Sequence, residues 1–83
     1  MTTERIEDFL TTRQRAEKPV RIFIRGRNPV EGLFVRARDY DELKAKNFWR
    51  VVQLSHLKDW QKTQDLGLTR VFSGLSFTRL SDK

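Results

Sequence analysis

Residues 19–38 read PVRIFIRGRNPVEGLFVRAR, and this stretch decides the fold. Arginines alternate with apolar residues on both sides of a turn sequence, Gly-Arg-Asn-Pro, at positions 26–29. Successive side chains of a strand point to opposite faces, so each run predicts a strand with one apolar and one cationic face. We expect strands at residues 20–25 and 30–38, joined by that turn.

The segments around this pair predict one helix and three more strands. Apolar residues at helical spacing, ended by Pro19, indicate a helix over residues 4–15. The polar stretch 39–47 indicates a loop with room for one helical turn. A strand is expected at 48–53, a short helix at 55–63, and two strands at 68–72 and 75–80. Gly32 inside the second strand indicates a bulge or sharp bend.

These elements predict a mainly β fold, in which an N-terminal helix precedes a strongly bent, five-stranded small barrel. The chain of 83 residues is too short for two cores, so residues 1–83 form one domain with the barrel at about 20–80. Closure would remove exposed sheet edges. A core this small would also be helped by burying surface in an oligomer.

Charge is the strongest functional signal. The formal net charge is +6, and residues 11–38 hold eight basic and two acidic side chains. A local cationic surface attracts phosphate-bearing partners such as nucleic acid. The alternative is a solvated face that keeps a small protein soluble.

Catalysis is not expected. The chain has no cysteine, and its single histidine, His56, falls in the expected short helix, where we interpret it as a surface residue. Asp39, Asp41 and Glu42 lack the glycine and distal glutamate of a calcium loop and indicate a solvated acidic loop. We expect no cofactor, no metal and no small-molecule substrate. No apolar run is long enough to span a bilayer and no secretory signal is visible, so we expect a cytoplasmic protein without membrane contact.

The candidate binding residues are cations close to aromatic rings. Arginine suits phosphate because its planar fork donates two parallel hydrogen bonds. An aromatic pair next to two lysines is typical of a base-stacking platform, with the alternative that one ring is core and the other packs at a subunit interface. The candidates are Arg13, Arg15, Arg21, Arg25, Arg36, Arg38, Lys44, Lys46, Phe48 and Trp49.

Residues 6–38 resemble the Hfq branch of the Sm/Sm-like RNA-binding proteins. The similarity rests on Phe9-Leu10 followed by basic residues, then on Pro19-Val20 before a strand, and on Gly32 in the second strand. The resemblance implies an SH3/Sm-like barrel capped by a helix. It also implies a ring in which the fourth strand of one subunit pairs with the fifth strand of the next. Arg15 matches a position in the basic rim through which that family contacts RNA.

Two functional hypotheses follow. In the first, the chain is an Sm-like barrel that forms a homo-oligomeric ring and binds single-stranded RNA through its basic surface. In the second, it is a non-enzymatic assembly module whose arginines contact acidic loops, such as the one holding Asp39 and Glu42, on a neighbouring subunit.

Overall fold

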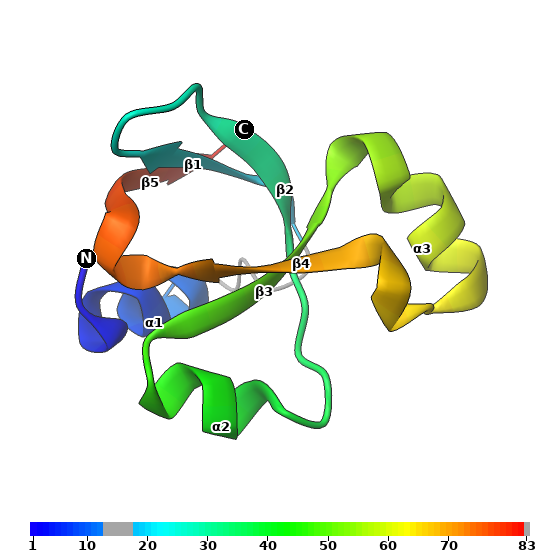
Figure 1. Ribbon diagram of the computed structural model, residues 1–83, viewed down its shortest axis with the longest axis horizontal. Coiled ribbons are helices and arrows are strands. Elements are labelled where there is room, and N and C mark those ends of the chain that lie inside the picture. Colours follow the sequence, from blue (N-terminus) through cyan, green and yellow to red (C-terminus); the bar gives the residue numbers. More distant parts are fainter. Residues whose placement is uncertain (13–17, 83) are drawn as a thin grey trace.

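The computed structural model describes residues 1–12 and 18–82. This part of the chain begins with helix α1 and continues into a five-stranded sheet that two further helices interrupt (Figure 1). The main elements are α1 (Thr3–Thr12), β1 (Val20–Ile24), β2 (Val30–Phe34), α2 (Tyr40–Ala45), β3 (Phe48–Gln53), α3 (Leu57–Thr63), β4 (Thr69–Ser73) and β5 (Phe77–Asp82). Short 3₁₀ turns lie at η2 (Leu54–His56), η3 (Leu66–Leu68) and η4 (Gly74–Ser76).

All neighbouring strands of the sheet are antiparallel, in the order β4-β3-β2-β1-β5. The predicted alternation in β1 is confirmed, because Val20 and Ile22 are fully buried while Arg21 between them is exposed. In β2 the buried positions are Val30, Gly32 and Phe34. One face of this strand pair therefore lines the core.

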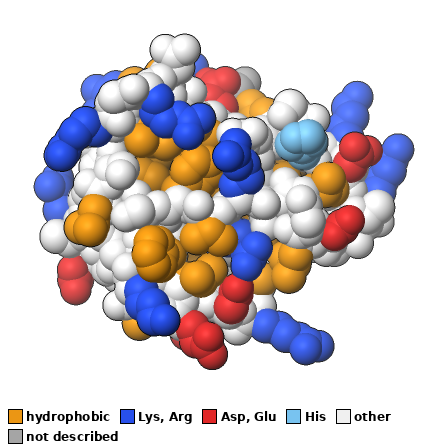
Figure 2. Space-filling model, in the orientation of Figure 1, with side chains coloured by type: hydrophobic (Ala, Val, Ile, Leu, Met, Phe, Trp, Pro, Cys, Tyr) orange, Lys and Arg blue, Asp and Glu red, His pale blue; other side chains and the backbone are white. Residues whose placement is uncertain are grey.

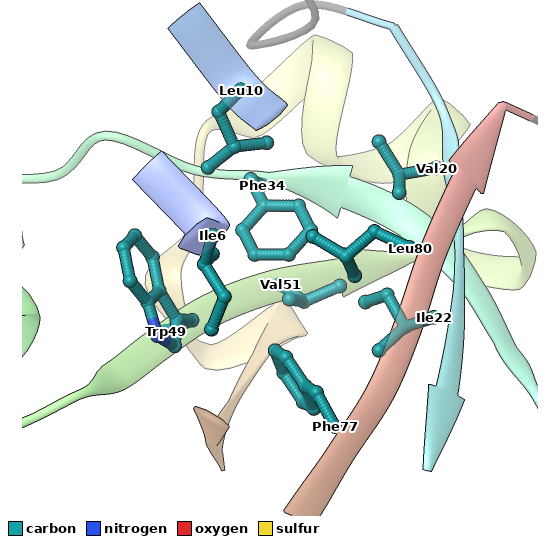
Figure 3. Packing of buried hydrophobic residues seen from close by; sticks show 9 residues of the cluster. All are labelled: Ile6, Leu10, Val20, Ile22, Phe34, Trp49, Val51, Phe77 and Leu80. Carbon is teal, nitrogen blue, oxygen red and sulfur yellow. The ribbon is translucent and has the colours of Figure 1, made fainter. Parts of the chain in front are cut away.

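The main core lies between α1 and the sheet. Ile6 and Leu10, one helical turn apart on α1, point toward Phe34 and the strands beneath it (Figure 3). The ring of Phe34 meets those of Trp49 and Phe77 edge-on, at centroid distances of 6.0 and 6.5 Å. A second, smaller cluster of Val35, Val52 and Trp60 with their neighbours packs α3 against β3. Aromatic and β-branched burial on both faces of β3 explains why this central strand was predicted with correct bounds.

Several boundaries differ from the sequence prediction. β2 ends at Phe34 rather than at residue 38, because Val35 turns into the second cluster after its N–H donates to the Arg50 carbonyl oxygen at 2.9 Å. Arg36 and Arg38 therefore do not share a strand face with Phe34. Residues 40–45, where a loop with one helical turn was expected, form helix α2. The last two strands start later than predicted, with η4 between them. The end of the first predicted helix falls on residues outside the described part.

The predicted closure of the sheet is not seen within one chain. The described residues contain no pairing between β4 and β5, so these strands are the two edges of the sheet. The guanidinium of Arg27, in the β1–β2 turn, lies over the Phe72 ring on β4 at 5.9 Å. This contact brings the turn against β4 across the open side.

Gly32 is a position where β2 and β3 approach each other closely. A Cβ atom there would lie 2.4 Å from the Val52 carbonyl oxygen and 2.8 Å from Val51 Cγ1. Because a backbone atom in a central strand cannot move aside cheaply, we expect Gly32→Ala to lower the free energy of unfolding by about 3 kcal/mol in urea titration. The control is Gly67→Ala, whose Cβ would have the Asp65 carboxylate as its nearest neighbour, at 3.2 Å. Equal losses in the two variants would contradict the close approach.

No helix in the described ranges is long and apolar enough to cross a membrane.

Candidate nucleic-acid interface

The described candidate cations divide between opposite ends of the sheet. Arg21 and Arg25 lie on or just after β1, next to the β1–β2 turn. The others surround α2, which lies at the far end (Figure 1). We call this second set the α2 basic group: Arg36, Arg38, Lys44 and Lys46. Arg13 and Arg15 lie outside the described residues.

Tyr40 organises the α2 basic group. Its ring lies 5.2 Å from the guanidinium carbon of Arg36 and 5.5 Å from Lys44 Nζ, both within cation–π range. The ring also meets buried Trp49 edge-on at 6.1 Å, which fixes it on the core. Burial raises the pKa of Tyr40, against the opposing effect of Arg36 and Lys44. The neutral ring therefore holds two cations beside each other.

Three members of the α2 basic group have no acidic partner among the described residues. Lys44 is paired with Glu7 of α1, and this hydrogen bond raises the pKa of the lysine. Arg36, Arg38 and Lys46 are exposed and form no ion pair with any described residue. These three side chains are free to meet phosphate oxygens.

The predicted stacking platform is reduced to one ring. Trp49 is 1% exposed, and its indole N–H donates to Asn47 Oδ1 at 2.8 Å. It is a core residue, so its assignment as a base-stacking residue was wrong. Phe48, which points to the opposite face of β3, is 39% exposed. The two rings diverge because side chains alternate along a strand, and packing decides which one faces inward.

Arg21 on β1 and Arg25 just after it differ in whether their charge is paired. Arg21 donates from Nε and Nη2 to one oxygen of Glu31, at 2.9 and 2.7 Å, directly across the β1–β2 ladder. Its charge is therefore balanced inside the chain. Arg25 is exposed and forms no ion pair among the described residues, and its backbone N–H donates to Ser76 in η4.

Sequence reasoning missed three arginines with defined roles. Arg50 Nη2 donates to Asp39 Oδ2 at 2.7 Å and its Nη1 donates to the Thr69 hydroxyl at 2.8 Å. These bonds connect the segment before α2 to β3 and β4.

The other two arginines lie over aromatic rings. Arg79 lies 4.2 Å from the centre of the Phe23 ring, directly opposite it in the β1–β5 ladder. Arg27 covers Phe72. No alternation of arginine with apolar residues marks Arg79 in the sequence, since Thr78 and Leu80 flank it, and its contact with Phe23 follows from the register of the ladder.

Asp39 gives this end of the sheet an acid-sensitive contact. The hydrogen bond from Arg50 lowers the pKa of Asp39. A carboxylate whose pKa is lower in the folded chain stabilises it above its ordinary pKa of about 4, and this contribution is lost as pH falls below that value. We expect the melting temperature to fall less between pH 7 and pH 3 in Asp39→Asn than in the unmodified chain. Asp41→Asn, at a side chain 92% exposed, is the control and should behave like the unmodified chain. An unchanged acid response in Asp39→Asn would refute the assignment.

Apolar side chains are exposed along the β4 edge. Val71 is 45% exposed and Leu75, in η4, is 73% exposed. Figure 2 shows the face that carries β4, where hydrophobic side chains gather among Lys and Arg side chains. Exposed apolar side chains on or near an unpaired edge strand are a common mark of an interaction surface.

His56 is exposed in η2. No cluster of His, Cys, Asp and Glu suited to a metal ion occurs among residues 1–12 and 18–82.

Comparison with known proteins adds no relative. No protein-family model matches the chain, and neither a curated protein nor a solved structure matches it.

Proposed function

We propose that this chain is an Sm-like subunit that assembles into a homo-oligomeric ring and binds single-stranded RNA through its basic surface. The observation that carries the proposal is a sheet with two unpaired edges in a chain that also presents exposed cations without a carboxylate partner among the described residues. In this proposal the bent sheet and α1 form a helix-capped barrel whose open side is completed by neighbouring subunits.

The two edges support assembly. An edge strand presents a row of backbone N–H and C=O groups that can pair with another chain. If β4 of one copy pairs with β5 of the next, the contact is head-to-tail and closes into a ring when the rotation allows. Such pairing would cover Val71 and Leu75. Helix α3 lies beyond the start of β4 and leaves the edge open (Figure 1).

The α2 basic group supports RNA as the ligand. Arg36, Arg38 and Lys46 offer three free cations at one end of the sheet, and Phe48 offers a partly exposed ring nearby in the chain. Single-strand binders combine cations that follow the backbone with aromatic rings on which bases stack. A ring of subunits would repeat these cations and aromatic rings. An RNA strand that contacts several subunits would therefore bind more tightly than a strand that contacts one.

The test is fluorescence anisotropy with U-rich, A-rich and mixed RNA oligomers, on protein whose mass in solution is measured in parallel. Binding by an oligomer supports the proposal. A monomer at all concentrations would refute the ring, and absence of RNA binding by a stable oligomer would refute the RNA function.

The second hypothesis, an assembly module, is favoured by one observation. Asp41 and Glu42 are exposed on α2, beside the free arginines, and could pair with arginines of a neighbouring subunit. The double variant Arg36→Glu/Arg38→Glu separates the hypotheses by its mass. Dissociation of the oligomer would support subunit contacts, whereas an intact oligomer that has lost RNA affinity would support RNA binding.

A further inference from the structure

We propose that the groove between the end of β2 and α3 holds one nucleobase of the bound strand. This inference rests on the proposed RNA function and adds the place where a base, rather than a phosphate, is contacted. The groove has a volume of about 470 Å³, within the range of small-molecule sites. Its lining includes Leu33, Val35, Arg36, Trp60, Gln61 and Gln64.

The groove is lined in part by a buried indole that carries an unused donor. Trp60 is only 7% exposed and packs in one cluster with Val35 and Val52. Its indole N–H has no hydrogen-bond partner among the described residues and is not fully enclosed. Buried indoles usually find a hydrogen-bond partner for this group, and we infer that a ligand in the groove supplies one here.

Gln64 holds a position that favours glycine. It ends α3 with φ +54°, in the left-handed region, where helices commonly place glycine. Its backbone N–H and its Nε2 both donate to the Trp60 carbonyl oxygen, at 2.8 and 3.0 Å. This contact fixes the side-chain amide and leaves its oxygen as an acceptor without a partner in the described chain. Gln61, three residues earlier, adds an exposed amide with both a donor and an acceptor.

These groups match the edge of a base. Nucleobase edges place hydrogen-bond donors beside acceptors, and side-chain amides can pair with both at once. An apolar ligand would leave the indole N–H and the amides unsatisfied. Arg36 belongs both to the groove and to the α2 basic group, so a strand whose phosphates lie on that group passes the mouth of the groove.

The test uses the double variant Gln61→Ala/Gln64→Gly, which removes both amides without straining the chain. Alanine is the best helix former, and glycine relieves the left-handed backbone at position 64. We therefore expect its urea midpoint to be at least that of the unmodified protein. The probes are a mixed-sequence RNA oligomer and an abasic oligomer of equal length.

We expect the unmodified protein to bind the base-containing strand about tenfold more tightly than the abasic one. In the double variant this ratio should fall severalfold, to what base stacking on Phe48 alone supplies, while the salt dependence of RNA binding stays unchanged. Ser55→Ala, at an exposed position in η2 outside the groove, is the control and should keep the tenfold ratio.

The outcomes separate this inference from the proposed function. A ratio near one in the unmodified protein, or a tenfold ratio that survives in the double variant, would overturn the base site and leave RNA binding standing. Loss of the ratio in Ser55→Ala would also overturn it. If neither strand binds the unmodified protein, the proposed function fails and the base site fails with it.

Discussion

Trp49→Ala should lower the free energy of unfolding by about 3–5 kcal/mol, the largest stability loss expected from a single substitution in this chain. The indole is 1% exposed, meets Phe34 and Tyr40 edge-on, and donates to Asn47. Its removal leaves a cavity and an acceptor without its donor. Because small domains are stable by only about 5–15 kcal/mol, much of that margin would be lost.

The measurement is urea unfolding followed by circular dichroism and by the fluorescence of Trp60, the tryptophan that remains. Phe48→Ala, at the adjacent and partly exposed ring, is the matched control and should cost less than half as much. A loss in Trp49→Ala no greater than that control would show that Trp49 is not the central core residue.

The double variant Arg36→Glu/Arg38→Glu should lose about a hundredfold in RNA affinity at low salt. Both side chains are exposed, and neither has a carboxylate partner among the described residues. Losing two phosphate contacts should also reduce the log–log salt slope by about 1.4, from about 0.7 per contact on single strands.

The matched control is Lys58→Glu/Lys62→Glu, which makes the same change of charge at two exposed positions on α3. An equal loss of affinity in this control would show that RNA responds to net charge alone. The α2 basic group would then have no special role.

The sequence predicted most of the elements because their signals are local. Alternation of arginine with apolar residues placed β1, and a run of aromatic and β-branched residues placed β3. The end of β2 was missed because its cause is distant in the chain. Val35 packs in one cluster with Trp60, which lies 25 residues further along the chain. The residues around position 35 do not predict this contact.

The sequence predicted which residue types form the candidate site, but not which of their side chains are buried or ion-paired. Period-two alternation separates Phe48 from Trp49, yet the inward face is chosen by packing against Phe34 and Tyr40. Similarly, the register of the ladder places Arg21 opposite Glu31, which neutralises its charge. The spacing of residues along the chain does not predict this register. The groove at α3 joins residues about thirty positions apart, so only the folded chain reveals it.

The central claim, RNA binding through free cations of an oligomer, is tested most directly by the affinity of the unmodified protein for an RNA oligomer across a salt series. The protein should be at a concentration where its mass shows an oligomer. With Arg36, Arg38 and Lys46 each meeting one phosphate, we expect a linear log–log plot with a slope of about −2 for each engaged subunit. A slope near zero, or no binding at low salt, would contradict the claim.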